Sequence, residues 1–370
     1  MIPKVLTTVL SSPFTRLAKK YFPLSPRRDF ETVIKKNYGG TADILTTPSG
    51  TYPGNGAFYS SVLLQDGRVF CIPFNSTTAR IYDPKSDVLT TPSGTYPGNG
   101  AFASGVLLAD GRVFCIPCNS TTARIYNPTT DTLSIPNGTY PGAEAYIGGV
   151  LLPDGRVFCS PSKAATARIY NPATDTLSIP SGTYSSNSAL YSFIGAVLLL
   201  DGRVFCVPSE ATTARIYNPI TDTVSIPSGI YPGGVAYIGG VLLPDGRVFC
   251  VPSQSTEARI YDPVSDTLTT PSGTYPGNLA DNNGVLLPDG RVFCTPRNSA
   301  TAAIYDPVTN AKTVSGIAFP GADAFVSSIL LADGRVFCVP YQSTSARIYG
   351  QSIGIRLPMG RTHSPYFNKF

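Results

Sequence analysis

The residue types that most often carry out chemistry in proteins are sparse in this chain. It has one histidine, His363, and eight cysteines among 370 residues. Catalytic triads, Cys-His nucleophile pairs and most zinc sites need a histidine held rigidly by its neighbours. His363 lies close to the end of the printed sequence, so we interpret it as a solvated residue. We predict no catalytic residue, no metal site and no cofactor.

Two further patterns have a chemical and a structural interpretation. Cys115 and Cys118 form a CxxC motif, which lowers a thiol pKa where it precedes a helix. No helix is expected here, and we interpret Cys118 as a variable loop residue. Asp83 and Asp87 resemble calcium ligands, but the spacing and the bidentate glutamate of an EF-hand are missing, so these segments are predicted to be turns.

Arginine occupies two regularly repeated positions. Repeated arginines of this kind could form a ring that binds phosphate, because guanidinium groups bind oxyanions in a bidentate manner. Asp and Arg occur in similar numbers, however, and we favour a structural role in which each arginine pairs with a turn aspartate of its own or the adjacent repeat. The arginines are Arg68, Arg112, Arg156, Arg203, Arg247, Arg291 and Arg335 in one set, and Arg80, Arg124, Arg168, Arg215, Arg259 and Arg347 in the other, with Ala303 in the sixth copy.

Cys115 and the first set of arginines belong to copies of one recurring stretch, Gly105–Pro117, which reads GVLLADGRVFCIP. Its Asp-Gly pair returns at intervals of 44 or 47 residues, at Asp66, Asp110, Asp154, Asp201, Asp245, Asp289 and Asp333. A fixed period in this range is typical of propellers and other repeat arrays. The abundance of glycine and proline, 35 and 34 residues, favours short strands joined by tight turns.

One copy divides into four expected strands, 102–108, 113–116, 123–126 and 132–135, separated by turn residues such as Asp110-Gly111. Four antiparallel strands per copy predict an all-β, seven-bladed β-propeller over residues 38–350. The last copy lacks a fourth strand, and we predict that Ile44 to Thr47 supplies it and closes the ring. The segment 353–357 is the rival for that place.

The repeat resembles the kelch family in its hydrophobic run, its DG turn and its RIYDP segment, over residues 43–349. It departs from the kelch pattern because Cys-x-Pro replaces the double glycine and the chain has no tryptophan. The resemblance implies a seven-bladed ring that binds other proteins. Near-identical blades also resemble repeat proteins of large viruses and phages, which suggests a virion component.

Seven cysteines occupy the same place in each copy. Equivalent residues of packed sheets lie about 10 Å apart, whereas a disulfide needs Cα atoms within about 7 Å. We therefore predict free, buried thiols and a reducing compartment or a virion. The cysteines are Cys71, Cys115, Cys159, Cys206, Cys250, Cys294 and Cys338.

Positive charge is concentrated outside the repeats. The net charge is +5, yet residues 1–37 hold eight Lys or Arg against Asp29 and Glu31, and residues 351–370 add three more. These two tails suggest an anionic partner, with residues 1–28 as an alternative organelle-targeting peptide. No apolar run is long enough to span a membrane. The candidate anchoring residues are Arg16, Lys19, Lys20, Arg27, Arg28, Lys35 and Lys36.

Information about binding is expected where the copies differ, since anything repeated seven times serves packing first. Differences concentrate in the loop after the second strand and in the loop before the first strand, where the fourth copy has extra residues within Ser185 to Ser192. Both loops should lie on one face, surrounded by Tyr96, Tyr140, Tyr231 and Tyr275. Neutral drift is the alternative explanation. The candidate binding residues are Phe74, Lys163, Glu210, Gln254, Arg297 and Tyr341.

Taken together, these features predict a non-enzymatic, protein-binding or structural module of a larger assembly, such as a viral or phage particle. Its basic tails would anchor it to that assembly. The alternative is a protein that binds a glycan or a receptor through the variable loop face.

Overall fold

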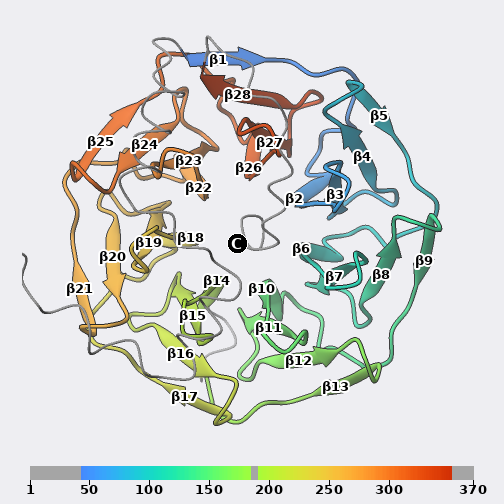
Figure 1. Ribbon diagram of the computed structural model, residues 1–370, viewed down its shortest axis with the longest axis horizontal. Helices are drawn as coiled ribbons and strands as arrows, with labels where there is room; N and C mark the ends of the chain where they lie inside the picture. The colour runs from blue at the N-terminus through green and yellow to red at the C-terminus, as the bar shows by residue number, and fades with distance from the viewer. Residues whose placement is uncertain (1–42, 185–190, 352–370) are drawn as a thin grey trace, which may run out of the picture.

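The computed structural model describes residues 43–184 and 191–351, and every structural statement below concerns these residues. They form seven four-stranded antiparallel sheets arranged as the blades of a ring (Figure 1). The predicted all-β, seven-bladed propeller is therefore confirmed. No helix of the described residues is long and apolar enough to cross a membrane.

Each blade runs from an inner strand at the ring axis to an outer strand at the rim (Figure 1). The inner strands are β2 (Phe58–Leu63), β6 (Phe102–Leu107), β10 (Tyr146–Leu151), β14 (Phe193–Leu198), β18 (Tyr237–Leu242), β22 (Asp281–Leu286) and β26 (Phe325–Leu330). The second strands are β3 (Val69–Pro73), β7 (Val113–Pro117), β11 (Val157–Pro161), β15 (Val204–Pro208), β19 (Val248–Pro252), β23 (Val292–Pro296) and β27 (Val336–Pro340).

The third strands are β4 (Arg80–Asp83), β8 (Arg124–Asn127), β12 (Arg168–Asn171), β16 (Arg215–Asn218), β20 (Arg259–Asp262), β24 (Ala303–Asp306) and β28 (Arg347–Gln351). The outer strands are β5 (Val88–Thr90), β9 (Thr132–Ser134), β13 (Thr176–Ser178), β17 (Thr223–Ser225), β21 (Thr267–Thr269), β25 (Ala311–Val314) and β1 (Asp43–Thr46). We number the blades 1 to 7 from β2 to β26.

The ring closes through β1, as predicted. Asp43 pairs with Gln351 and Thr46 with Ile348, so β1 is the outer strand of blade 7. The Asp43 carboxylate accepts hydrogen bonds from the Tyr349 hydroxyl at 2.8 Å and from the Gly316 backbone N–H at 2.8 Å. Asp87 does the same for blade 1, accepting from Tyr82 and from Ser49. The rival closing segment, 353–357, lies outside the described residues.

Aromatic stacking between blades makes up much of the core. The Phe of each second strand stacks on the Tyr of the next blade's third strand, with ring centroids 4.7 to 5.2 Å apart. Such pairs stabilise beyond the area they bury, and this one is repeated around the whole ring. The seven pairs are Phe70–Tyr126, Phe114–Tyr170, Phe158–Tyr217, Phe205–Tyr261, Phe249–Tyr305, Phe293–Tyr349 and Phe337–Tyr82.

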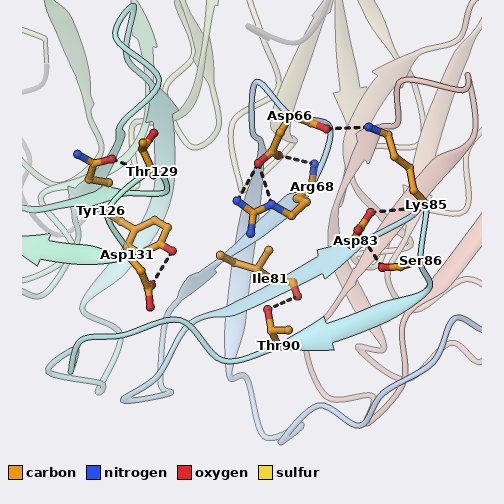
Figure 2. Close-up of polar contacts among 11 residues, drawn as sticks. Asp66, Arg68, Ile81, Asp83, Lys85, Ser86, Thr90, Tyr126, Thr129 and Asp131 are labelled. Carbon is orange, nitrogen blue, oxygen red and sulfur yellow. Dashed lines mark hydrogen bonds and ion pairs between the residues drawn. The ribbon is translucent and has the colours of Figure 1, made fainter. Parts of the chain in front are cut away.

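The DGR turns between inner and second strands are structural, as expected. In blade 1, the Asp66 carboxylate accepts from the backbone N–H and guanidinium of Arg68, and Lys85 donates to the Asp66 carbonyl (Figure 2). All seven turns contain this Asp-Arg ion pair at 2.6 to 2.7 Å. Gly67 has a φ of 90°, a conformation that favours glycine.

The prediction that the third-strand arginines also pair with turn aspartates is wrong. Arg80 donates to the Thr78 hydroxyl at 2.9 Å and to the Ala79 carbonyl at 3.1 Å, and the arginines of blades 2, 3, 4 and 7 also donate to a hydroxyl two residues earlier. These arginines are the first residues of the third strands, which places them at the end of the blade opposite the DGR turns and far from the turn aspartates. Arg259 alone of this set has a carboxylate partner, Glu257.

The cysteines are free and buried, as predicted. Burial raises the thiol pKa of both Cys115 and Cys118 to about 12. Cys115 lies in β7 and Cys118 follows it, with no helix behind them. The CxxC motif therefore has none of the features that lower a thiol pKa.

Candidate functional site

The two variable loop sets meet on one side of the ring, which we call the loop face. The Gly56 backbone N–H donates to the Tyr341 carbonyl at 2.8 Å, and Phe74 donates to Ala57 at 2.8 Å, so each blade's loop is held by the connecting loops beside it. The DGR turns and the turns before the outer strands lie on the opposite side, the turn face. The predicted clustering of both loop sets on one face is confirmed by these bonds.

Three of the six predicted binding residues come together on consecutive blades. Tyr341 of blade 7 and Phe74 of blade 1 both pack on Tyr59, with ring centroids 5.9 and 5.1 Å from the Tyr59 ring. Arg297 of blade 6 is ion-paired with Asp323 and donates to the Asn282 side-chain oxygen at 3.4 Å. We call Tyr59, Phe74, Asn282, Arg297 and Tyr341 the aromatic–arginine cluster.

The electrostatics of Tyr59 connect the two halves of this cluster. Burial raises the pKa of the Tyr59 hydroxyl to about 12, and the nearby Arg297 charge and an Asn282 hydrogen bond oppose that rise. Tyr59 therefore stays protonated at neutral pH and keeps an O–H that can donate. Tyr59, Phe74, Arg297 and Tyr341 are mostly buried but each keeps part of its surface exposed, 17% for the Arg297 side chain, so a ligand could contact part of each.

Beneath the cluster, the inner strands enclose a cavity of about 150 Å³ along the ring axis, lined in part by Tyr59 and Asn282. Its wall is polar on one side only. Blades 6, 7 and 1 contribute Asn282, Asn283, Ser327, Ser328, Ser60 and Ser61, whereas blades 2 to 5 contribute mostly Gly, Ala, Val and Ile. The polar wall and the aromatic–arginine cluster thus belong to the same three blades.

Crowding at the axis explains the small residues of the remaining wall. A Cβ added at Gly148 would lie 2.5 Å from the Ile194 carbonyl oxygen of the next blade. In blade 6 the equivalent residue is Asn283, which donates to the Ser327 hydroxyl at 3.2 Å. Pairing of β22 with β23 is interrupted from Asp281 to Gly284, a longer irregularity than in the other blades. The larger polar side chains therefore come with a local break in the sheet.

Asp281 is the most unusual residue of this region. It is 1% exposed, stands where the other six blades have Phe or Tyr, and its Oδ1 has no hydrogen-bond partner among the described residues. Burial raises the carboxyl pKa to about 8, opposed by the charge of Lys312. Lys312 replaces the Leu or Val of other outer strands, and Ala303 replaces the third-strand Arg. At these three positions blade 6 thus lacks the aromatic, the arginine and the aliphatic residue of the other blades.

The other predicted site residues lie elsewhere. Lys163 and Glu210 meet on blades 3 and 4 around Tyr191, where Lys163 Nζ lies 4.1 Å from the ring centroid and Glu210 accepts from the Tyr191 N–H at 2.6 Å. Gln254 is exposed on blade 5. The anchoring residues Arg16, Lys19, Lys20, Arg27, Arg28, Lys35 and Lys36 lie outside the described residues, as do His363 and residues 185–190 of the fourth-blade insertion.

The tyrosines expected around the binding face are not part of any surface. Tyr96, Tyr140, Tyr231 and Tyr275 are 1 to 2% exposed. Tyr96 packs edge-on against Phe102, with ring centroids 6.1 Å apart, and its counterparts in regular blades do the same. The connecting loops place these rings between blades, because burying a large aromatic side chain is more favourable in free energy than exposing it to solvent.

Sequence comparison of the loops alone missed Tyr59, Asp281, Asn282 and Asn283. The signal was present in the first-strand column, where blade 6 reads DNNG and the regular blades have an aromatic followed by small or aliphatic residues. Polar residues at otherwise apolar positions mark a departure from packing. Among the described residues, no group of three or more His, Cys, Asp or Glu side chains is placed to hold a metal ion.

No family model matches the chain, and no curated protein matches its sequence. Solved structures share its fold. A streptogramin B lyase superposes with a TM-score of 0.71 at 12% identity, over 84% of this chain and 98% of that one. Virginiamycin B lyase from Staphylococcus aureus gives 0.70 at 10% identity, over 84% and 100%. A fungal alcohol oxidase in complex with copper gives 0.62 at 11%, over 84% and 76%.

These similarities correct the prediction that the chain is not an enzyme. That prediction rested on the scarcity of histidine and on the sameness of the blades, yet the similar structures include two lyases and an oxidase. A propeller of this fold therefore supports catalysis in other proteins, and blade symmetry does not separate binding proteins from enzymes. Identities of 10 to 12% establish the shared propeller fold and nothing finer.

Proposed function

We propose that the protein is a binding propeller that holds a segment of a partner protein on its loop face, at the aromatic–arginine cluster. The observation that supports this is the concentration of Tyr59, Phe74, Arg297 and Tyr341 on three consecutive blades, all partly exposed. Tyr and Arg side chains in partly desolvated clusters dominate the energetics of protein interfaces. The polar cavity wall of the same blades adds donors and acceptors for the backbone of a bound segment.

A display library of random peptides, selected on the immobilised full-length protein, tests this function. Replacing Tyr341 or Arg297 with Ala should weaken selected peptides by about tenfold or more, since such side chains cost at least about 1.4 kcal/mol when they are hot spots. Gln254→Ala is the matched control, because Gln254 follows the second strand of blade 5 and lies away from the cluster. Equal losses for all three variants, or no selected peptide, would contradict the proposal.

A glycan is the second candidate ligand, and one arrangement favours it. Accessible parts of the Tyr59 and Tyr341 rings lie beside the Arg297 guanidinium, which combines ring faces with a hydrogen-bond donor. A glycan array with the same three variants separates the candidates. Sugar binding that is lost in Tyr341→Ala and retained in Gln254→Ala, without peptide binding, would assign the cluster to a glycan.

The same proposal includes a larger assembly to which the basic N-terminal segment anchors the propeller. The kelch-like repeat is consistent with a protein-binding member of an assembly, such as a viral or phage particle, with residues 1–37 as its basic anchor. Deleting residues 1–37 should then abolish co-purification with the native assembly while the thermal unfolding of the propeller stays the same. Co-purification at the original level would remove the anchoring role and leave the loop-face site untouched.

A further inference from the structure

The turn face carries an exposed apolar surface on blades 4 to 6. Leu200, Ile220, Val264 and Val308 are 75, 76, 93 and 85% exposed, and we call these four residues the turn-face patch. Leu200 precedes a DGR turn, and the other three sit at the tips of the outer turns. The same positions in blades 1 and 2 hold Gln65, Lys85, Ala109 and Thr129. A scattered exposed apolar residue is ordinary, but a concentration on three neighbouring blades indicates an interaction surface.

Contacts between turns bring blades 4 and 5 together on this face. Leu200 of blade 4 reaches over the DGR turn of blade 5, where a Cβ added at Gly246 would lie 2.9 Å from its Cδ1. Arg203 of blade 4 donates to the carbonyl of Pro263 at 3.5 Å, directly before Val264. The turns of neighbouring blades therefore lie side by side, and the patch follows the ring as an arc.

The chain leaves the ring beside this arc. Its last described strand, β28, ends at Gln351, at the place where the other blades begin their outer turn. Phe293 of blade 6 stacks on Tyr349 with ring centroids 4.7 Å apart, so this exit adjoins the blade that carries Val308. Because β1 occupies the outer place in blade 7, the segment 353–359 is not needed to close the ring.

The sequence of that segment matches the patch in pattern and charge. Ile353, Ile355, Leu357 and Met359 alternate with other residues, the period that puts apolar side chains on one face of an extended chain. Arg356 and Arg361 add positive charge. The turns of blades 5 and 6 carry more acids than bases, with Asp245, Asp262, Asp266, Asp289 and Asp306 against Arg247 and Arg291.

We propose that residues 353–359 bind back onto the turn-face patch of the same chain, with their alternating apolar side chains on Val308 and Val264 and their arginines near the aspartates of blades 5 and 6. This covers the patch and leaves the loop face free. The proposal concerns the face opposite the aromatic–arginine cluster and is independent of the ligand proposed there.

Pairs of introduced cysteines in the full-length chain test the docking. Met359→Cys is combined either with Val264→Cys in blade 5 or with Thr129→Cys in blade 2. Both partners occupy the same turn position, and both lie two blades from blade 7, in opposite directions around the ring. Eight residues separate Gln351 from Met359 and span about 26 Å when extended, which gives an undocked tail equal access to either side. The native thiols are buried and do not compete.

Docking predicts that mild oxidation forms the Met359→Cys/Val264→Cys bridge within the monomer in preference to the Thr129→Cys bridge, by about tenfold for each 1.4 kcal/mol of docking free energy. Adding Ile355→Asp and Leu357→Asp should remove that preference, because the alternating apolar face is then lost. Equal yields for the two pairs, or no bridge in either, would overturn the proposal. Bridges that appear only in dimers would overturn it too, and would indicate that the turn-face patch binds a second copy of the chain.

Discussion

Blades 2 and 6 have the same strand order but different interiors at the start of the inner strand. Blade 2 has Phe102 there, fully buried, with Arg124 opening the third strand and Leu133 in the outer strand. Blade 6 has Asp281, Ala303 and Lys312 at the corresponding places. Yet the stacking contact to the next blade is the same in both, with ring centroids 4.8 Å apart for Phe114–Tyr170 and 4.7 Å apart for Phe293–Tyr349.

The difference shows which part of a blade can change. The second and third strands hold neighbouring blades together through stacked rings, and the rings Phe293 and Tyr305 keep these contacts in blade 6. The inner strand meets the axial cavity and the loop face, and there blade 6 exchanges apolar packing for polar groups. A buried carboxyl group with an oxygen that lacks a hydrogen-bond partner among the described residues lowers stability, so its presence next to the aromatic–arginine cluster is consistent with selection for a site rather than for packing.

Transferring the blade 6 residue into blade 2 should have the largest effect. Phe102→Asp removes a buried ring and introduces a buried carboxyl group, so we expect a loss of about 3 to 5 kcal/mol in the free energy of unfolding. Phe102→Tyr is the control, since Tyr146 and Tyr237 occupy this position in blades 3 and 5. Chemical denaturation measures both, and a loss below about 1 kcal/mol for Phe102→Asp would show that the position tolerates charge in any blade.

The reverse exchange should stabilise the protein. Converting Asp281, Ala303 and Lys312 to Phe, Arg and Leu gives blade 6 the interior residues of blade 2. Replacing buried ionisable groups by apolar packing raises the free energy of unfolding by about 1 to 4 kcal/mol. Thermal unfolding checks the gain, with the single change Ala303→Arg as the control. A lower melting temperature for the triple variant would mean that Asn282 and Asn283 require Asp281 for their positions.

The raised pKa of Asp281 predicts a pH dependence of stability. Its carboxyl pKa is about 8 in the folded protein and about 4 in an unfolded chain, so the folded state favours the protonated form. Stability should therefore be highest below about pH 4 with respect to this group and fall as the pH rises towards 8. We expect Asp281→Asn to reduce the difference in unfolding free energy between pH 5 and pH 8 by at least about 1 kcal/mol. An unchanged pH profile would place the Asp281 pKa in its usual range.

The smallest effects are expected at the turns, where the two blades agree. Arg112→Ala removes an exposed ion pair to Asp110, and such pairs contribute about 0 to 1 kcal/mol. The Arg291–Asp289 pair of blade 6 is less exposed, with 26 and 19% of the side chains accessible against 31 and 49% in blade 2, so Arg291→Ala should cost more. Urea denaturation of the two variants measures the loss in the free energy of unfolding. Equal losses would show that exposure does not determine how much these ion pairs stabilise the protein.

Much of the fold followed from the repeat itself. The period, the Asp-Gly turns and the alternation of apolar residues gave seven blades, four strands in each and closure by an N-terminal strand, because these are local properties of short strands and tight turns. Strand limits differed from the expected ones by at most one residue. The role of the third-strand arginines was mispredicted, since it depends on which end of a blade a side chain faces.

The candidate site was harder to predict than the fold. Phe74, Arg297 and Tyr341 were predicted to lie on one face as variable loop residues, but the sequence does not show that they gather around Tyr59. Tyr96 and its counterparts looked accessible because they lie in loops, and the packing between blades buries them. Tyr59 and Asn282 were not recognised because inner strands of a regular repeat are expected to serve packing.

The sequence by itself determined the architecture, because each copy specifies its own strands and turns and seven similar copies can bury their faces only against one another. Tertiary structure decided what the differences between copies mean. Closing the ring brings blade 6 beside blade 7 and blade 7 beside blade 1, so that Arg297, Tyr341 and Tyr59 meet at one end of the axial cavity. It also places Gln351 beside blade 6, on the face opposite that cluster. Both arrangements depend on distances across the closed ring, which no single repeat encodes.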